Sequence, residues 1–399
     1  MTKRILAALA AMLLAAVSAF AQPLAQPVES PAPSLLTSEV NAPPASARSF
    51  WTTVDYLFAV NRASHLPSLV TTSVPGTPRP AAGILGVPTT TTLFGGWAND
   101  ELRSGVRLGA GWWFEGDRNF GVDIGFLVLE SQSAIFSGSS DGSPILARPY
   151  TSALDGTQEA VLVAFPGATS GSIDIRAQTA NFYTGHAVFT EKAIDEGWFR
   201  LNAQIGYRYY RYDESLRIGQ VVTPTDPNFI AGTTLTTRDI FATRNDFHGC
   251  DIGVRSQFVW DSLTLDVLTR IAVGKIYREV QIDGSQIVAV PGAAPVSQVG
   301  GVYALSSNSG LFTRSDWKTM PEITATLSWR VLANLNVRLG YTFLLLDNIV
   351  RAPDQIEPLI NPNLFPPAVP GASPNQPAFS MHRTSLWIQS INLGLEFTY

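Results

Sequence analysis

The sequence predicts an all-β protein, a transmembrane antiparallel up-and-down β-barrel of about ten strands. Three observations carry this prediction: apolar residues at every second position from residue 50 onward, connections that alternate between short and long, and a leader for export. Only 15% of the 399 residues are charged, against roughly a quarter in ordinary soluble domains. This composition favours one large β-structure over several helical domains.

Residues 1–21 have the pattern of an export signal. Lys3 and Arg4 precede an apolar run that ends in the small residues Ala19 and Ala21 on either side of Phe20. We expect cleavage after Ala21. No cysteine follows the run, which excludes a lipoprotein anchor. Residues 22–49 are rich in Pro, Ala and Ser and are expected to form a flexible periplasmic linker, with the barrel over 50–399.

The strands are taken in order along the chain. Residues 50–60, 103–113 and 119–128 alternate cleanly between apolar and polar or small residues; in the last of these, Phe120, Val122 and Ile124 are separated by Gly121 and Asp123. Weaker or longer alternation predicts the remaining strands near 171–190, 197–219, 235–260, 262–281, 313–331, 334–350 and 383–399.

The connections between these strands alternate in length. Short turns are expected at 115–118, 191–197, 260–262 and 331–334, and long irregular stretches at 61–101, 138–170, 220–234, 282–312 and 351–382. Outer-membrane barrels have short periplasmic turns and long outer loops, so both ends of the barrel are expected on the periplasmic side. The strand count would reach twelve or more if parts of 61–101 or 282–312 fold back into the ring.

Aromatic residues mark the two expected membrane interfaces. Near the short turns and the C-terminus lie Trp112, Trp198, Trp260, Trp329 and Tyr399, and toward the long loops lie Phe58, Tyr209, Trp317 and Phe343. Amphipathic rings prefer the headgroup level, so two aromatic girdles are predicted. The closing strand alternates to its end, and we expect Phe397 and Tyr399 to act as the assembly signal for the barrel-assembly machinery.

Composition also argues against other classes of protein. A soluble β-sandwich would alternate as well, but it does not need an apolar, uncharged face on every strand. The net charge of −5 argues against a nucleic-acid partner. The single cysteine, Cys250, allows neither an internal disulfide nor a metal cluster and is expected on the lipid face. No cofactor is predicted, and the expected partners are outer-membrane lipid, periplasmic chaperones and the assembly machinery.

The inward positions of the strands carry charges of both signs. They are predicted to be Asp55, Arg103, Arg107, Asp123, Arg200, Arg208, Arg255, Arg270, Glu322, Arg330, Arg338 and Glu396, together with Asp174, Arg176, Asp251 and Asp266. Arginine can bridge carboxylates across a lumen. Open aqueous channels belong to barrels of roughly 16–18 strands, so a ten-stranded barrel is expected to be narrow or plugged.

Several segments resemble a known family. They are "LFGGWANDELRSGVRLGAGWW" (93–113), "DGSPILARPY" (141–150), "LVAFPGATSGSIDIR" (162–176), "YRYDESLRI" (211–218), "TRNDFHG" (243–249), "INPNLFPP" (360–367) and "INLGLEF" (391–397). The chain over roughly 50–399 resembles a bacterial outer-membrane β-barrel family labelled a β-barrel porin family, seventh in its naming series. The resemblance implies an outer-membrane location and a barrel, and it brings no catalytic residues.

Three functions remain open from the sequence. The first is passage of small solutes or ions, for which Arg107, Arg208 and Arg338 would set a preference for anions. The second is a plugged barrel whose outer loops bind a partner. The loops concerned are 137–150, 164–172 and the proline-rich stretch 352–379. The third is an enzyme.

The enzyme hypothesis is the least supported of the three. Its candidate residues are His65, His186, His248 and His382 with the acids Asp316, Asp354 and Glu357. Nothing in their spacing brings an acid and a histidine together, because they are scattered over strands and loops. We therefore expect no enzymatic activity and no catalytic residue.

Overall fold

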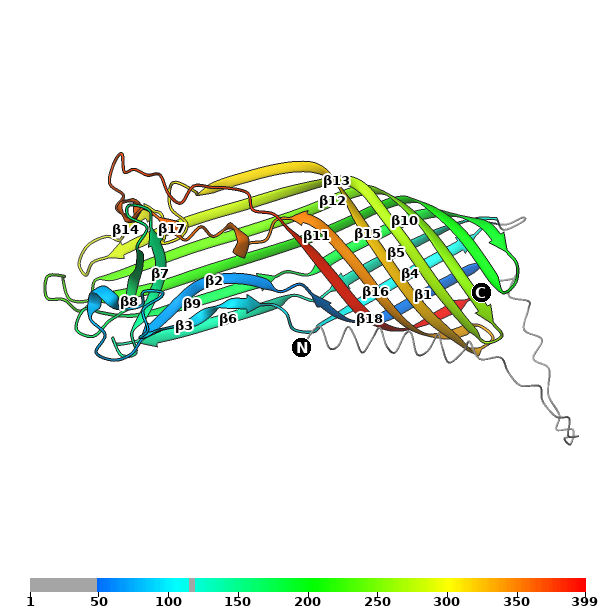
Figure 1. Ribbon diagram of the computed structural model, residues 1–399, viewed down its shortest axis with the longest axis horizontal. Coiled ribbons are helices and arrows are strands. Elements are labelled where there is room, and N and C mark those ends of the chain that lie inside the picture. Colours follow the sequence, from blue (N-terminus) through cyan, green and yellow to red (C-terminus); the bar gives the residue numbers. More distant parts are fainter. Residues whose placement is uncertain (1–48, 115–118) are drawn as a thin grey trace, which may run out of the picture. The chain divides into compact units, whose positions relative to one another are not determined.

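The computed structural model describes residues 49–114 and 119–399, which are built almost entirely from β-strands (Figure 1). Ten strands form a closed antiparallel ring in the order β10-β5-β4-β1-β18-β16-β15-β13-β12-β11, and pairing of β10 with β11 closes it. Their bounds are β1 (Phe50–Asn61), β4 (Arg103–Trp113), β5 (Phe120–Leu129), β10 (Phe182–Asp195), β11 (Phe199–Pro224), β12 (Thr234–Trp260), β13 (Leu263–Ala289), β15 (Gly310–Leu332), β16 (Leu335–Ile349) and β18 (Thr384–Thr398). The predicted ten-stranded barrel is confirmed.

Some sequence predictions fall outside this description. The predicted leader (1–21), nearly all of the predicted linker (22–49) and the predicted turn at 115–118 lie outside the described residues. Within the part that is described, no helix is long and apolar enough to cross a membrane.

The strand predicted at 171–190 is wrong as a single element. The chain forms β9 (Thr169–Thr179) and then β10, with a break at residues 180–181. Only β10 belongs to the ring, where it pairs with β5 and the first half of β11. β9 pairs with the second half of β11 and with β6 (Gln132–Ser140), beyond the end of the ring.

The long connections are also more ordered than predicted. A second sheet contains β2 (Ser64–Ser73), β3 (Thr90–Ala98), β7 (Leu146–Ser152), β8 (Gln158–Ala164) and β17 (Leu359–Ile360), and β14 (Val296–Val299) pairs with the end of β13. Short 3-10 helices occur at Arg79–Ala81, Pro353–Gln355 and Pro362–Leu364. None of these strands enters the ring, so the lumen is not widened by them.

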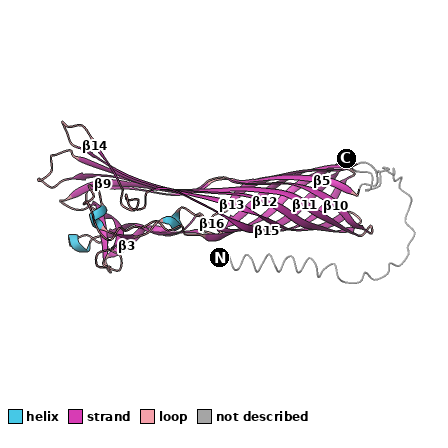
Figure 2. Ribbon diagram, turned by 90° about the horizontal axis from the view of Figure 1, so that it is seen from above, coloured by secondary structure: helices cyan, strands magenta, loops and turns pink. Residues whose placement is uncertain are grey.

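Strands β11, β12 and β13 run without a break from the ring into this outer structure (Figure 1). Together with β2, β3, β6, β7, β8, β9, β14, β17 and the connections between them, their outer halves form what we call the outer module. It consists of two sheets with side chains packed between them, and Figure 2 shows β3 on one side and β9 and β14 on the other.

The two faces of β11 exchange their polarity along the strand. In the periplasmic half the outward side chains are apolar: Leu201, Ala203, Ile205 and Tyr207. In the outer half they are polar: Arg211, Asp213, Ser215 and Arg217. The inward side chains change in the opposite sense, from Asn202, Gln204 and Arg208 to Tyr210, Tyr212, Leu216 and Ile218. The outward faces of β12 and β13 change in the same sense, from apolar to mostly polar, so the surroundings of the strands change from lipid to water near this point.

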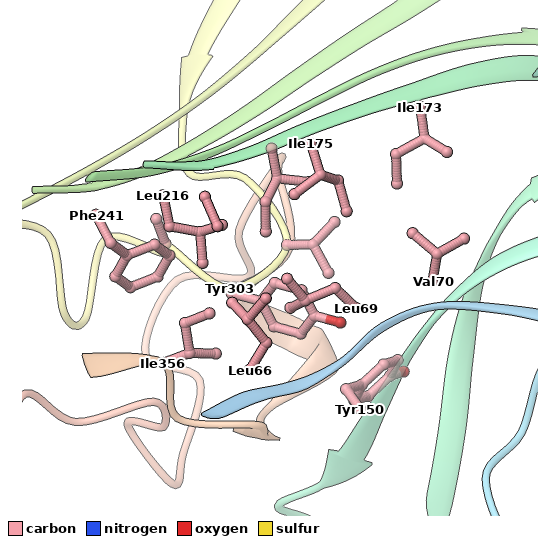
Figure 3. Packing of buried hydrophobic residues seen from close by; sticks show 14 of the residues in the cluster. Leu66, Leu69, Val70, Tyr150, Ile173, Ile175, Leu216, Phe241, Tyr303 and Ile356 are labelled. Carbon is pink, nitrogen blue, oxygen red and sulfur yellow. The ribbon is translucent and has the colours of Figure 1, made fainter. Parts of the chain in front are cut away.

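The outer module has its own apolar core. Figure 3 shows side chains from both of its sheets and from the connecting segments meeting there, among them Leu69, Val70, Ile175, Leu216 and Phe241. All five of these side chains are almost completely buried. This packing explains why the long connections hold a defined structure although they lie outside the ring.

A buried ion pair fixes the connection between β13 and β15 to this core. Arg148 Nη2 lies 2.7 Å from Asp239 Oδ2, and both side chains are fully buried. Oδ1 of Asp239 accepts hydrogen bonds from the backbone N–H groups of Val302, Tyr303 and Ala304, at 2.9, 3.0 and 2.8 Å. Burial raises the pKa of Tyr303 to about 12, so its hydroxyl stays protonated and donates to Pro149 O at 2.8 Å.

The last strand closes the ring on both of its edges. β18 pairs with β1 from Trp51↔Thr398 and with β16 from Leu335↔Phe397. Tyr399 N donates to Phe50 O at 2.8 Å, and the rings of Phe50 and Tyr399 lie 6.2 Å apart. The end of the chain therefore contributes hydrogen bonds and ring contacts at the closing point of the barrel.

We predict that Asp239→Ala loosens the outer module while the ring stays folded. The substitution leaves Arg148 buried without its partner and frees three backbone donors, a change that costs about 3–5 kcal/mol in buried ion pairs. Limited proteolysis should cut residues 290–309 much faster than in the parent protein. Asp283→Ala, at an exposed position on β13, is the control; equal protection in both variants would contradict the assignment.

We also predict that deletion of Phe397–Tyr399 prevents barrel assembly. The deletion removes the ladder partners of Trp51, Thr52 and Leu335 at the closing point. Loss of the heat-modifiable folded band from outer-membrane fractions is the expected result. Tyr399→Phe keeps the ring contact with Phe50 and should assemble normally. A deletion variant with a normal folded band would refute the prediction.

Candidate functional site

The interior of the ring holds a cavity of about 270 Å³. Twelve of the sixteen predicted inward charged residues line it: Asp55, Arg107, Asp123, Arg200, Arg208, Arg255, Asp266, Arg270, Glu322, Arg330, Arg338 and Glu396. Thr, Ser, Asn and Gln side chains, such as Thr326 and Gln257, share the wall. Charged and hydrogen-bonding side chains therefore make up most of the cavity's lining, with apolar side chains such as Leu268 among them.

Arg103 is one of the predicted inward residues that lie away from the cavity. It is fully buried but does not line the cavity. Its Nε donates to Glu130 O at 2.8 Å and its Nη2 to Ala180 O at 3.1 Å, while Nη1 donates to Asn61 Oδ1 at 3.4 Å. These acceptors lie where β1, β5 and β9 end, so Arg103 satisfies backbone carbonyls at strand ends.

Glu322 on β15 is the centre of the charge network. Arg208 Nη2 donates to Glu322 Oε2, and Arg107 Nη2 and Arg270 Nη2 each lie 3.8 Å from Glu322 Oε1. Asp251 stands behind them, with Oδ2 at 3.2 Å from Arg208 Nε and 3.6 Å from Arg270 Nη1. Side chains from β4, β11, β12, β13 and β15 therefore meet across the lumen.

A second group of charges surrounds Asp123 on β5. Its Oδ1 is hydrogen-bonded to His186 Nε2 at 2.8 Å, and its Oδ2 accepts from Arg255 Nη1 at 3.3 Å. Arg255 Nε also lies 3.6 Å from Asp266 Oδ2, which accepts from the Gln257 amide at 2.9 Å. This chain of contacts again crosses from one side of the ring to the other.

A third group lies where β1, β16 and β18 meet. Arg338 Nε lies 3.8 Å from Asp55 Oδ1, and its Nη1 lies 3.6 Å from Glu396 Oε2. Asn336 donates to Glu396 Oε1 at 2.8 Å. With this group, most of the cavity's arginines face a carboxylate, so the positive charge of the wall is largely neutralised within the wall itself.

Glycines make room for these long side chains. Gly394 is the register partner of both Asp55 and Arg338, and a Cβ there would lie 2.0 Å from Asp55 Oδ1. Gly253 is the partner of Arg270, and a Cβ there would lie 2.5 Å from Arg270 Cγ. In both pairs the charged side chain lies across the neighbouring strand in the space that the glycine leaves free.

Above the cavity, the outer end of the ring is filled by apolar side chains, which we call the apolar layer. It consists of Leu57, Ala59, Leu127, Leu129, Phe182, Tyr210, Tyr212, Phe247, Ala272, Ile276, Met320, Leu344, Leu346, Ile349, Leu386 and Ile388. The rings of Tyr210 and Phe247 are stacked with centroids 5.1 Å apart. The layer has members from every ring strand except β4, where Leu129 Cδ2 would lie 2.4 Å from a Cβ at Gly105.

A buried polar junction lies beside the apolar layer, toward the outer module. Glu214 Oε1 accepts from Arg351 Nη2 at 2.7 Å, from Tyr212 Oη at 2.7 Å and from Thr179 at 3.2 Å. Arg351 Nη1 also donates to Arg62 O and Ala63 O at 3.1 and 3.0 Å. The junction joins the ends of β1 and β9 to β11 and to the segment after β16.

The apolar layer has no counterpart among the sequence predictions, and two outer residues lie on the face opposite to the predicted one. Asp174 and Arg176 were predicted to point inward, but both are exposed, and Ile173 and Ile175 point into the core of the outer module. The reason is the exchange of faces beyond the ring. A signal was present on β11, where the alternating apolar residues pass from odd positions up to 209 to even positions from 210.

The predicted girdle residues lie on the outside of the ring. Trp112, Trp198, Trp260, Trp329 and Tyr399 are exposed by 49–62% at its periplasmic end. Toward the other end, Trp317 is exposed by 72%, and Tyr209 and Tyr277 surround His248. Cys250 is exposed on β12, on the same face as Ile252.

The candidate residues of an enzyme do not form a common site. Asp316 accepts from Arg278 Nη1 at 2.8 Å, and His382 uses its backbone to contact Gln355. His186 does meet an acid, Asp123, but this pair lies inside the charged wall of the lumen. Among the residues described, no group of His, Cys, Asp and Glu side chains is arranged to hold a metal ion.

Solved structures with a similar arrangement of strands include an outer-membrane protein. The outer membrane protease OmpT of Escherichia coli has 8% identity and a TM-score of 0.43, with 89% of this chain and 98% of that chain covered. A Pseudomonas aeruginosa FadL homologue has 7% identity and a TM-score of 0.25, with 88% and 90% covered. At these scores neither likeness bears on function. A comparison with curated proteins finds no match.

A family model matches nearly all of the described chain. The family is described as "Putative beta barrel porin-7 (BBP7)", and the match covers residues 51–399. Its description as a porin points to a non-enzymatic protein of the outer membrane. The match includes the whole ring and the outer module, so the chain belongs to this family of outer-membrane β-barrel proteins, BBP7.

Proposed function

We propose that this protein is a closed outer-membrane barrel that holds the outer module at the cell surface, where the module contacts a partner. The observation that carries the proposal is the apolar layer, which fills the ring at the outer end of the charged cavity. Ions and polar solutes cross a membrane through water or between polar groups. A dry layer of tightly packed side chains offers them neither.

The depth of the closure supports the same proposal. Leu57, Phe182, Tyr212, Phe247 and Leu346 in the apolar layer have no exposed surface. Beyond them follow the junction of Glu214 with Arg351 and then the core of the outer module. A solute would have to part the packed side chains of the apolar layer to pass from the cavity toward the cell surface.

The tip of the outer module supports a role in contacting a partner. Phe229 and Ile230, in the connection between β11 and β12, are exposed by 52% and 62%. They border a groove that also includes Leu235, Val288 and Pro366. Exposed apolar groups that gather at one place on a surface are typical of sites for protein contacts.

A second candidate function is the passage of small solutes. The polar cavity of about 270 Å³ on the periplasmic side favours it, as does the porin description of the family. In this case the apolar layer would act as a gate that opens to let the solute pass. The cavity's arginines would then meet the solute, although carboxylates such as Glu322 and Asp55 already neutralise several of them.

We predict that folded protein in a planar bilayer gives no discrete conductance steps. Tyr210→Ala combined with Phe247→Ala removes two stacked rings from the apolar layer, and this variant should give steps because water can enter the gap. Phe189→Ala and Tyr277→Ala remove rings of the same kind from the outer face and serve as the control pair. Steps of equal size from the parent protein would disprove the closed barrel and favour the gated pore.

In the opened variant, we predict that arginine replacement changes ion selectivity. Arg107→Gln, Arg208→Gln and Arg338→Gln together remove positive charge from the cavity wall. The reversal potential in a salt gradient should therefore shift away from anions. Arg176→Gln, Arg217→Gln and Arg238→Gln, at exposed positions of the outer module, are the matched control. An unchanged reversal potential would exclude an anion preference set by these arginines.

A further inference from the structure

A cluster of basic side chains lies where β15 leaves β16 at the outer end of the ring. Asp316 on β15 is in contact with three arginines: Arg278 Nη1 at 2.8 Å, Arg383 Nη1 at 3.4 Å and Arg314 Nε at 3.7 Å. Arg278 is buried, whereas Arg314 and Arg383 are exposed. One carboxylate cannot neutralise three guanidinium groups, so positive charge remains available at this point.

Two further basic residues extend the cluster. Arg62, at the end of β1, is exposed, and its Nη1 donates to Thr384 Oγ1 at 3.2 Å and to Ser385 O at 2.9 Å. Lys318 lies two residues after Asp316, and its charge acts on Asp347. We call Arg62, Arg314, Lys318 and Arg383 the rim cluster.

The acidic groups that interact with these basic side chains are fewer than the basic groups. They are Asp316, Asp347 and Asp354, against Arg62, Arg278, Arg314, Lys318 and Arg383. Asp347 is also engaged by the side chains of Ser385 and Asn348. A local surplus of positive charge is unexpected in a chain whose net charge is −5. It indicates an anionic ligand.

The position of the rim cluster along the axis of the barrel indicates where this ligand lies. Trp317, exposed by 72%, lies on the outward face of β15 between Asp316 and Lys318. On β1, Arg62 follows the outward ring of Phe58, and on β18 Arg383 precedes Trp387. Exposed tryptophans of membrane proteins lie at the level of the lipid headgroups. The rim cluster therefore lies at the level of the outermost aromatic residues, where headgroup phosphates are found, with Arg314 and Lys318 on the face of β15 opposite to Trp317.

We propose that the rim cluster binds the phosphate groups of anionic lipid headgroups in the outer leaflet. Guanidinium groups match phosphate oxygens with two parallel hydrogen bonds, and basic residues beside a membrane surface attract anionic lipids. Arg314 and Arg383 already lie on either side of Asp316, so a phosphate could meet both of them. A lipid fits this position better than free phosphate because the site lies beside the membrane.

The test uses the folded full barrel in nanodiscs of phosphatidylcholine with a small fraction of phosphatidic acid. Native mass spectrometry counts the phosphatidic acid molecules that stay bound. The parent protein should retain phosphatidic acid in preference to phosphatidylcholine. The variant Arg62→Gln, Arg314→Gln, Lys318→Gln, Arg383→Gln should lose at least about tenfold in this preference, since each basic residue near an anionic surface contributes about fivefold.

A control variant removes the same charge elsewhere. Arg79→Gln, Arg176→Gln, Arg217→Gln and Arg238→Gln change exposed positions of the outer module, away from the outermost aromatic residues. It should retain phosphatidic acid as the parent does. Equal loss in both variants would mean that only the overall charge matters, and no loss in the rim variant would exclude the site; either result overturns the proposal.

Two further arms complete the test. If the fourfold variant does not fold, the pair Arg314→Gln and Arg383→Gln replaces it and should lower the preference by a smaller but measurable factor. Inorganic phosphate is added in excess to the parent protein and should leave the bound lipid in place. Displacement of phosphatidic acid by inorganic phosphate would show that the site recognises free phosphate, and the lipid proposal would be wrong.

Discussion

Three strands of this barrel pass from a membrane into water while their backbone ladders continue without a break, and the side chains must satisfy both solvents. In lipid the outward face has to be apolar and the lumen can be polar, whereas in water the outward face has to be polar and the interior apolar. β11 meets this demand by exchanging its two faces, and the outward faces of β12 and β13 change from apolar to mostly polar near the same level. The polar lumen, the apolar layer and the outer core all follow from this exchange.

The interior of the ring is filled by different kinds of side chains below and above the level at which the strand faces change. Below the level of exchange, the narrow interior holds long charged side chains. Arginines meet carboxylates there because an unpaired charge away from bulk water is costly. Glycines such as Gly253 and Gly394 leave the space that these side chains occupy. Above that level, the rings and aliphatic chains of the apolar layer pack against one another inside the ring.

The ring could be predicted from the sequence because its signal is local. An alternation of period two marks each strand, as in 119–128, and a short turn marks each periplasmic end. Trp112, Trp198, Trp260 and Trp329 could be placed on the outside for the same reason. The break within 171–190 escaped prediction because β9 and β10 differ in their partners, and partners are set by contacts distant in the sequence.

The outer module was harder to predict because it has no single period. β2 and β3 alternate weakly, and their stability comes from packing against residues such as Ile175 and Leu216 from other parts of the chain. Arg148 and Asp239 are 91 residues apart, and their ion pair has no local signature. Asp174 and Arg176 point outward and not inward because water surrounds β9, so its polar face is exposed and its apolar face is buried.

The continuous ladders of β11, β12 and β13 also decide how far the protein reaches. From Lys275 to Ala289, β13 continues beyond the aromatic residues, and at about 3.3 Å per residue this stretch measures roughly 45 Å along the strand. Hydrogen bonds on both sides along much of this length resist bending. The tip with Phe229 and Ile230 is thus held at a set distance from the bilayer, beyond the headgroups, and an approaching macromolecule would meet it before it meets the lipid.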